Sequence, residues 1–354
     1  MTRLVVAIDQ LYRPQPGGIA SYVRGLLQGL ASLDGDWQVS GVAPRGHLED
    51  APTLTATSVP LDVATLTRVW RYVPLGVRAD ADVVHATSLA GPFAGGRRHA
   101  IHSVAVHDLL WRDRPEATTP RGVRFHERRL GYVRAREEIR VMVTSPGLSG
   151  RLVAEGFDPS RLHQVRLGVD DATPAADPAT VALALARVGV AGPYSLYVGT
   201  REPRKNIERL VAAHARARRR RPDLGPLVLV GPAGWGSVAT ADAVVLGAQS
   251  RSLVKGLLRD ATVMAYVALA EGWGLPPVEA LFAGTRVVVS ADCPSVAGVE
   301  DVVRVDPLDV DSIADGLARA LDHGDDAAAR ERRHAAVADL TWANCALEHV
   351  TGWR

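Results

Sequence analysis

The chain has 354 residues, 47% of them hydrophobic and 23% charged, which indicates a folded globular protein long enough for two domains. Its formal net charge of +2 argues against a general nucleic-acid-binding protein, and its longest apolar run, residues 263–270, is too short to span a membrane. The apolar run near the N-terminus is too short for a secretory signal, and two cysteines are too few for a disulfide framework, so we expect a cytoplasmic protein.

The first half of the chain alternates short β-rich runs with helical patterns. Strands are expected at residues 4–8, 39–43, 82–87, 103–108 and 141–145, and helical stretches at 19–31 and 120–138. Short apolar runs bounded by turn or polar residues are typical of buried parallel strands. The pattern therefore predicts an α/β domain over residues 1–172.

The same alternation restarts after a polar stretch rich in Ala, Pro and Asp, residues 170–180. Strands are expected at 194–200, 226–232, 244–248, 262–268 and 286–292, within a second α/β domain over residues 173–340. We thus predict two Rossmann-like, doubly wound parallel sheets. Since such sheets bind ligands beyond the carboxyl ends of their strands, we expect the two domains to face each other across a ligand-binding cleft.

Two residues just before the first predicted helix and two at the end of the fourth predicted strand are candidates in the first domain. Gly17 and Gly18 open the helix at 19–31, and His107 and Asp108 close the strand at 103–108. A lone histidine in an α/β protein is more often structural, but the end of a strand favours a place in the site. The first helix is not opened by Gly-x-Gly-x-x-Gly, which argues against a nicotinamide enzyme.

Two cations mark the first loop of the second domain. Arg204 and Lys205 lie between the strand at 194–200 and a helix that begins near Asn206. Cations beside the unpaired N–H groups of a helix N-terminus make an anion-binding site. Without further support, however, two solvated loop charges would be the better interpretation.

A second loop, residues 271–275, gives that support. Its glycines, Gly272 and Gly274, allow close approach of the backbone to a ligand, and the following two prolines suit the first turn of a helix that carries Glu279. Glu271 beside two glycines has no evident structural task, so we expect a functional carboxylate. Glu279 has two interpretations, a ligand-binding carboxylate or a partner of the helix dipole.

The sequence VGTREPRKN (198–206) followed by EGWGLPPVEALFAGTRVVVSADCPS (271–295) resembles the retaining, GT-B-fold glycosyltransferases of family 4, also called glycosyltransferase group 1. Their pattern is Gly-x4-Arg-Lys-Asn followed by Glu-x7-Glu. The resemblance extends to residues 16–30, 106–116 and 143–170. It also covers residues 341–354, which in this fold form a helix that packs back on the N-terminal domain. Trp273 departs from the Phe or Tyr of many members, and Ala297-Gly298 from their acidic residue.

The resemblance implies a role for each matched residue. Arg204 and Lys205 would grip the donor diphosphate, and Glu279 would bind the ribose hydroxyls. Glu271 and the backbone of Gly272, Trp273, Gly274 and Leu275 would contact the donor sugar and phosphates. His107, with Asp108 beside it, would lie near the donor sugar from the first domain, and Gly17 and Gly18 would let the N-terminal loop approach the phosphates and acceptor. The base would lie near residues 245–248, around Leu246.

The implied function is a retaining hexosyltransferase that uses no metal and no cofactor. It would move a hexose, with mannose favoured, from a GDP-, UDP- or dTDP-linked donor to a glycan or a lipid-linked sugar. The Asp-x-Asp pairs at 34/36, 80/82 and 309/311 look like turns or helix caps, so we expect no metal site. Two alternatives stay open: a sugar-nucleotide epimerase of related fold, and a catalytically silent nucleotide-sugar-binding protein.

An arginine-rich segment, residues 112–140, holds nine arginines and five acids. One interpretation is a solvated surface helix. The other is contact with an anionic membrane or a lipid-pyrophosphate acceptor, which would place the protein on the inner face of the cell membrane.

Overall fold

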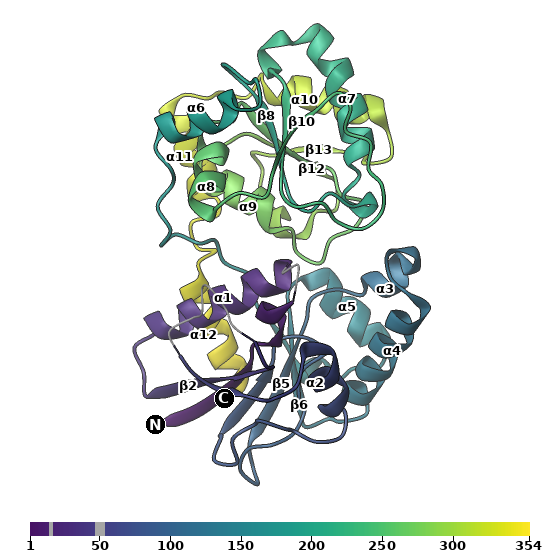
Figure 1. Cartoon of the computed structure of the whole chain (residues 1–354), viewed down its shortest axis with the longest axis vertical. Helices are drawn as coiled ribbons and strands as arrows, with labels where there is room; N and C mark the ends of the chain where they lie inside the picture. The colour runs from purple at the N-terminus through teal and green to yellow at the C-terminus, as the bar shows by residue number, and fades with distance from the viewer. Residues whose placement is uncertain (14–16, 47–53) are drawn as a thin grey trace. The chain divides into compact units, whose positions relative to one another are not determined.

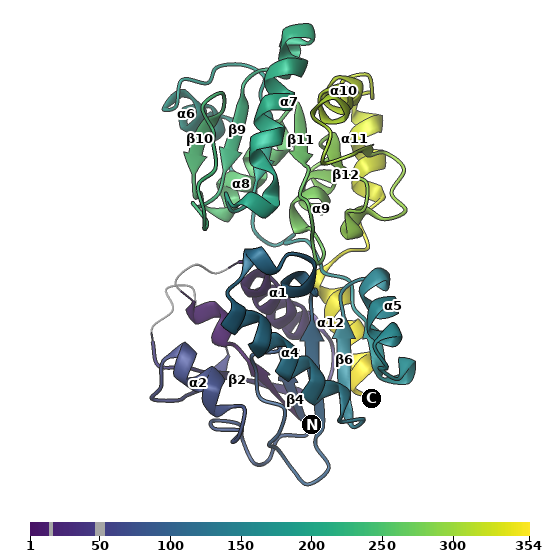
Figure 2. The same ribbon diagram turned by 90° about the vertical axis from the view of Figure 1, so that its right-hand side faces the viewer.

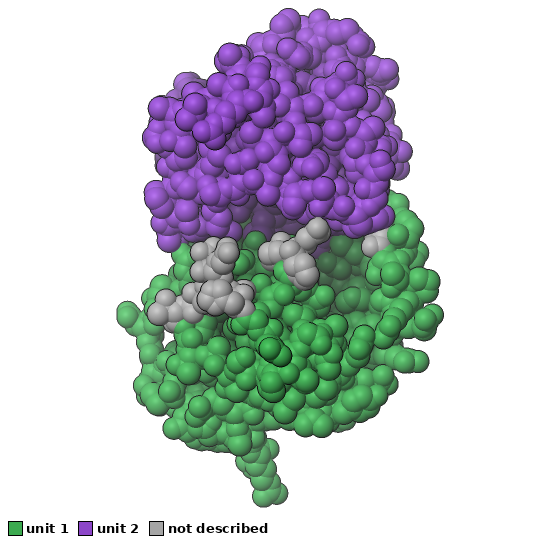
Figure 3. Space-filling view, viewed as in Figure 1, with its two compact units in different colours: residues 1–168, 340–354 green, residues 169–339 purple. Residues whose placement is uncertain are grey.

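The computed structural model describes residues 1–13, 17–46 and 54–354, which form two compact units (Figures 1, 2 and 3). Unit 1 comprises residues 1–168 and 340–354, and unit 2 comprises residues 169–339. The domain boundary expected at 172/173 compares with 168/169 in the structure. The last helix, which follows unit 2 in the chain, belongs to unit 1.

Unit 1 is built on a parallel sheet of seven strands in the order β3-β2-β1-β4-β5-β6-β7. The strands are β1 (Thr2–Ala7), β2 (Trp37–Ala43), β3 (Thr55–Ser58), β4 (Val83–Ala86), β5 (Ile101–Val106), β6 (Ile139–Val143) and β7 (Leu162–Gln164). The central strands are buried because helices cover the sheet, so they carry the continuous apolar runs of a parallel sheet.

The helices of unit 1 are α1 (Gly18–Ser32), α2 (Val63–Val69), α3 (Leu110–Asp113), α4 (Pro120–Arg134), α5 (Pro146–Ala154) and α12 (Trp342–Trp353), with single 3₁₀ turns η1 (Asp9–Tyr12), η2 (Pro115–Ala117) and η3 (Pro159–Arg161). Four of the six helices described in unit 1, α2, α4, α5 and α12, begin at a side-chain cap. Thr119 and Ser145 each accept a backbone N–H at the start of α4 and α5, where a proline occupies the first turn.

Three glycines allow the C-terminal helix α12 to pack closely on unit 1, where it lies beside α1 (Figures 1 and 2). A Cβ atom on Gly25 would lie 2.0 Å from the ring of Trp342, and one on Gly29 would lie 1.9 Å from the Trp342 carbonyl oxygen. A Cβ atom on Gly168 would lie 2.3 Å from the backbone nitrogen of Trp342. The backbone of α12 can approach this closely only because all three positions lack a side chain.

Unit 2 is built on a parallel sheet of six strands in the order β10-β9-β8-β11-β12-β13. The strands are β8 (Ser195–Val198), β9 (Leu227–Val230), β10 (Val244–Gly247), β11 (Val263–Tyr266), β12 (Val287–Ser290) and β13 (Val303–Val305). The helices are α6 (Pro178–Ala186), α7 (Ile207–Arg220), α8 (Arg251–Asp260), α9 (Leu275–Phe282), α10 (Val310–Ala320) and α11 (Ala327–Ala335), with turns η4 (Pro203–Lys205), η5 (Pro222–Leu224) and η6 (Pro294–Val296). Helix α7 packs against α10, and α8 against α6 and α9.

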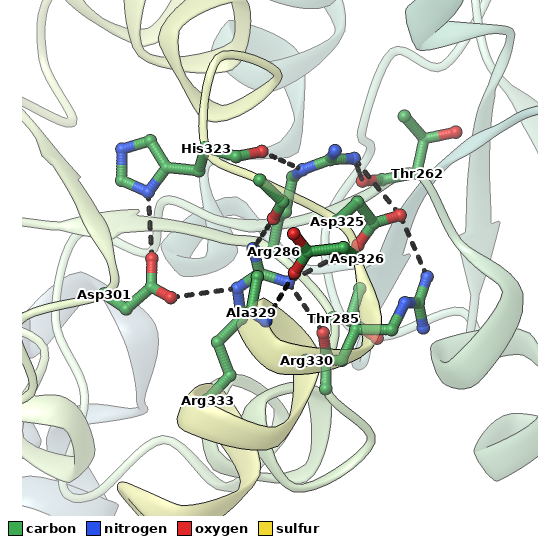
Figure 4. Close-up of polar contacts among 12 residues, drawn as sticks. Thr262, Thr285, Arg286, Asp301, His323, Asp325, Asp326, Ala329, Arg330 and Arg333 are labelled. Atoms are coloured by element: carbon green, nitrogen blue, oxygen red, sulfur yellow. Dashed lines mark hydrogen bonds and ion pairs between the residues drawn. The ribbon is translucent and has the colours of Figure 1, made fainter.

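A buried arginine fastens α11 to the rest of unit 2 (Figure 4). The Arg333 guanidinium donates through Nη1 to the Gly284 carbonyl oxygen at 2.9 Å and through Nη2 to that of Gly324. Its Nε lies 3.2 Å from Asp301 Oδ2, and its Nη1 lies 3.4 Å from Asp325 Oδ1. The side chain is fully buried, so these carbonyls and carboxylates replace the water that the charge would otherwise bind.

The predicted fold class is confirmed: the chain forms two doubly wound parallel sheets. Every predicted strand is present, and three further strands, β3, β7 and β13, lie at sheet edges. No helix within the described ranges is long and apolar enough to cross a bilayer.

Candidate functional site

Two loops meet at the carboxyl edge of the unit 2 sheet. Strands β8 and β11 are parallel neighbours, so the turn η4 after β8 and the loop 267–274 after β11 leave the same edge. Asn206, which follows η4, adopts the left-handed conformation with φ of 60° and donates from Nδ2 to the carbonyl oxygens of Val267 (3.0 Å) and Pro307 (2.6 Å). The Leu269 N–H donates to the Arg204 carbonyl oxygen at 2.9 Å, so the two loops are fixed to each other.

The predicted residues Arg204 and Lys205 both donate to one carboxylate oxygen of Glu271, the third residue predicted from the motifs. Glu271 Oε1 accepts from Arg204 Nη1 at 2.9 Å, from Lys205 Nζ, and from the Tyr266 hydroxyl at 2.9 Å. Lys205 Nζ also donates to the Tyr266 oxygen at 2.5 Å. The four side chains make one hydrogen-bonded cluster, with Lys205 and Tyr266 buried.

The cluster is electrically balanced. Burial raises the pKa of Glu271, but the charges of Lys205 and Arg204 outweigh burial and hold that pKa below its ordinary value. Burial disfavours the charge on Arg204, but Glu271 and Glu202 keep its pKa above the ordinary value. Glu202 Oε1 accepts from Arg204 Nη2 at 2.5 Å, so two carboxylates neutralise two cations. An anion that binds here has to compete with Glu271.

The loop 272–275 presents backbone donors beside this cluster. Gly274, with φ of 95°, is the N-cap of α9 and offers no side-chain cap. Ser295 donates from Oγ to the Gly274 carbonyl oxygen at 2.6 Å and from its N–H to that of Trp273 at 3.0 Å. The carbonyls are thus engaged, whereas the N–H groups of Gly272, Gly274 and Leu275 form no hydrogen bond with any described residue. Free amides next to two cations can hold a phosphate.

Two predicted residues of unit 2 lie outside this cluster. Glu279, on α9, has a pKa raised by burial; Asp170 adds to this, and Arg251 and Lys255 oppose it. Arg251 Nε donates to Asp170 Oδ2 at 2.8 Å, so Glu279 faces a separate charged group at the start of α8. Leu246 is half-buried in the edge strand β10.

The remaining predicted residues belong to unit 1. His107 follows β5 and donates from Nε2 to the Thr87 carbonyl oxygen at 2.9 Å, and burial lowers its pKa. Asp108 Oδ1 accepts from the Leu110 N–H at 3.0 Å and so shapes the start of α3. Gly17 and Gly18 are exposed at the start of α1, and a Cβ atom on either would meet nothing within 4 Å. Packing within the described residues therefore does not demand glycine there.

Two of the three aspartate pairs considered as metal ligands are engaged in a helix cap, an ion pair or a backbone hydrogen bond. Asp309 Oδ1 accepts from the Asp311 N–H at 2.8 Å and caps α10. Asp80 pairs with Arg78 at 2.9 Å, and Asp82 accepts from the Arg3 N–H at 2.8 Å. Among the residues that the structure describes, no three His, Cys, Asp or Glu side chains are grouped so as to hold a metal ion.

Residues 190–336 match the family model described as Glycosyl transferases group 1. The chain is 31% identical to O-antigen chain mannosyltransferase B of Escherichia coli over an alignment of 181 residues. That alignment covers 46% of this chain and 45% of the relative, so the match spans about half of that protein's length. This chain is 27% identical, over 367 aligned positions and 86% of each chain, to the MMP alpha-(1->4)-mannosyltransferase of Mycolicibacterium hassiacum.

Solved structures resemble the whole chain. The sucrose-phosphate synthase of Thermosynechococcus elongatus superposes with a TM-score of 0.74 at 19% identity, covering 99% of this chain and 98% of its own. The Anabaena protein HepE, solved in complex with UDP and glucose, superposes with a TM-score of 0.71 at 15% identity and 99% coverage of both chains.

Proposed function

Because residues 190–336 form a group 1 glycosyltransferase domain and the two units have the GT-B fold, we propose that the protein is a glycosyltransferase that uses a nucleotide-diphosphate sugar. The single observation that carries this proposal is the cluster of Arg204, Lys205 and Glu271 beside the free amides of residues 272–275. Two cations and several N–H donors at the carboxyl edge of a parallel sheet suit a diphosphate.

The same groups suit the bond that would break. When a sugar leaves a nucleoside diphosphate, negative charge grows on the departing phosphate, and donors already fixed in place stabilise that charge. In this proposal the diphosphate takes over the cations that Glu271 now neutralises. The freed Glu271 carboxylate then turns to the donor sugar, and Glu279 binds the ribose.

We propose transfer with retention of configuration by substitution on one face of the sugar. In this mechanism a leaving phosphate oxygen takes the proton of the attacking acceptor hydroxyl. A covalent intermediate on Glu271 is the alternative that this proposal disfavours. Unit 1 would supply the acceptor side, with His107 near the donor sugar and Gly17 and Gly18 near the acceptor.

For the donor sugar we propose mannose, carried by GDP, with UDP and dTDP donors as the alternatives. The two relatives named as mannosyltransferases support mannose. The base would lie near Leu246, and the acceptor would be a glycan or a lipid-linked sugar. No metal and no cofactor are part of the proposed reaction, since the two cations supply the positive charge that a metal would otherwise bring.

We also propose that α4 touches an anionic membrane surface from the cytoplasmic side. Most arginines of the segment 112–140 have structural partners: Arg129 is buried and donates to the Leu89 carbonyl oxygen at 2.7 Å, and Arg112 pairs with two glutamates. In contrast, Arg121, Arg124 and Arg128 are exposed, follow one face of α4, and form no ion pair with a described residue. Flotation with phosphatidylglycerol vesicles, compared with phosphatidylcholine vesicles, tests this surface.

The proposed function is tested by a thermal-shift screen against UDP, GDP, dTDP and ADP, followed by transfer assays with the matching sugar donors. At one hundred times Kd, a nucleotide stabilises by about 2.7 kcal/mol, which is enough to identify the base. In the proposed transfer, nucleotide is released as the sugar is bonded to the acceptor. Conversion of the donor to an epimerised sugar without acceptor would instead identify an epimerase, and binding without turnover a silent binding protein.

A further inference from the structure

A buried chain of polar side chains joins α1, β4, β5 and α12 within unit 1. The Tyr22 hydroxyl oxygen lies 2.8 Å from Nε2 of His85 and 2.8 Å from Nε2 of His349. All three side chains are fully buried. Tyr22, His85 and His349 are not among the site residues predicted from the sequence, yet a fully buried polar network of this kind calls for an explanation.

The contacts fix which atom of each pair carries the proton. Nδ1 of His349 lies 2.7 Å from the Cys345 carbonyl oxygen, and a carbonyl only accepts, so Nδ1 is the protonated nitrogen. Burial lowers the pKa of His349 to about 4, so the ring is neutral and its Nε2 carries a lone pair. The Tyr22 hydroxyl therefore donates to His349.

The rest of the chain follows from this assignment. Having used its proton, the Tyr22 oxygen accepts from His85 Nε2, and burial keeps the His85 pKa well below its usual value. The unprotonated Nδ1 of His85 then accepts from Ser103 Oγ at 2.9 Å, which itself accepts from Trp353 Nε1 at 2.8 Å. The hydrogen bonds thus run in one direction, from the Trp353 indole N–H to the Cys345 carbonyl oxygen, and both of these residues belong to α12.

The Tyr22 ring also packs against the imidazole ring of His107. The two ring centroids are 4.8 Å apart at an interplanar angle of 73°, an edge-to-face contact. His107 Nε2 donates to the Thr87 carbonyl oxygen, and the Thr144 hydroxyl donates to the His107 carbonyl oxygen at 3.1 Å. The ring is thus held at Nε2 and along one face, and Nδ1 is left as a lone-pair acceptor when the ring is neutral.

We propose that Tyr22 is a positioning residue that holds His107 with Nδ1 ready to accept a hydrogen bond from a sugar hydroxyl, and that α12 sets the position of Tyr22 through His349. The inference rests on the proposed function, since it assumes that His107 meets a sugar. It adds that a helix entered directly from unit 2 controls the geometry of a site residue in unit 1.

Tyr22→Phe tests the proposal, because it keeps the ring and removes the hydroxyl that links the two histidines. The matched control is Tyr194→Phe in unit 2, whose buried hydroxyl donates only to the Leu257 carbonyl oxygen at 2.7 Å. Two quantities are measured: the imidazole ¹⁵N chemical shifts of His107, and kcat. The His107 signals are assigned as those that are missing from the spectrum of His107→Gln. In Tyr22→Phe we expect the His107 shifts to change and kcat to fall about tenfold, with nucleotide affinity within about twofold of wild type.

A second pair of variants keeps the test independent of how Tyr22→Phe folds. His349→Gln leaves an acceptor for the Tyr22 hydroxyl and should keep the His107 shifts of wild type, whereas His349→Leu removes the acceptor and should reproduce Tyr22→Phe. The proposal is overturned if Tyr22→Phe matches Tyr194→Phe in the His107 shifts, or if the shifts change while kcat does not. Absence of transfer by the wild-type protein would refute the proposed function, and the ¹⁵N shifts would still decide whether Tyr22 and α12 hold His107.

Discussion

Replacing Glu271 by Gln removes one charge from the cluster and keeps the size of the side chain. The Glu271, Lys205 and Arg204 side chains are only 12%, 10% and 17% exposed, so their charges interact largely out of water. Removing one partner of a buried ion pair typically costs 3–5 kcal/mol, because the other charge stays behind. Gln keeps an oxygen for Tyr266, and Glu202 stays with Arg204, so we expect about 3 kcal/mol at neutral pH.

For a unit of the size of residues 169–339, that loss corresponds to a Tm lower by about 6–12 °C. The pH dependence has a definite sign. Glu271 has a lowered pKa in the folded state, so its contribution is present above its unfolded pKa of about 4.3 and is lost as the pH falls through the lower folded value. The Tm difference between wild type and Glu271→Gln should therefore shrink in acid.

Calorimetry with and without inorganic pyrophosphate completes the test, with Glu300→Gln, an exposed glutamate of the same unit, as control. Pyrophosphate no longer competes with a carboxylate in Glu271→Gln, so it should raise the Tm of that variant more than that of wild type. Equal Tm values for wild type and Glu271→Gln without ligand, or equal stabilisation of both by pyrophosphate, would refute the idea that Glu271 is the internal counter-ion of the two cations.

Three other predictions concern the packing of α12 on α1, the ion pairs of Asp325 with Arg330 and Arg333, and metal dependence. Gly29→Ala should lower the free energy of unfolding of unit 1 by about 2–3 kcal/mol in denaturant, because its Cβ would lie 1.9 Å from the Trp342 carbonyl oxygen. Gly131→Ala, with open space at its Cβ, should be neutral or stabilising. Equal effects of the two substitutions would contradict the close packing of α12 on α1. Asp325→Asn should lower the free energy of unfolding by about 1–2 kcal/mol, because the Asp325 carboxylate neutralises Arg330 and the buried Arg333. Asp315→Asn, which removes one partner of an exposed pair, should cost less than about 0.5 kcal/mol, and the reverse order would contradict the role of Asp325. Excess EDTA should leave glycosyl transfer unchanged, and a loss restored by Mn²⁺ would show that the reaction needs a metal.

The interior strands and the edge strand β10 could be predicted from sequence, whereas the edge strands β3, β7 and β13 could not. Interior strands such as β4 and β11 are buried on both faces and read as unbroken apolar runs. The edge strands β3, β7 and β13 are short, and β3 is exposed along its whole length, so they carry no such run. The helix expected over 120–138 ends at Arg134, four residues earlier, because hydrogen bonds to carbonyls near its end close the last turn at Ala135.

The candidate site was predictable where a motif carried it. The family match confirms the resemblance to group 1 glycosyltransferases, and Arg204, Lys205 and Glu271 meet as their motifs suggested. Tyr266 was missed because its hydroxyl ends an otherwise apolar strand, where an aromatic residue is usually interpreted as core. Tyr22 and His349 were missed because they are 327 positions apart, and only the return of α12 to unit 1 brings them together.

The central claim is that Arg204 and Lys205 bind the diphosphate of a nucleotide sugar. The most direct test is isothermal titration of the nucleoside diphosphate that stabilises the protein most, with wild type, Lys205→Met and the control Arg216→Met, an exposed cation of the same unit. Loss of one buried charged contact should weaken binding to Lys205→Met at least about thirtyfold, with Arg216→Met unchanged. Equal affinity of Lys205→Met and wild type would contradict the claim.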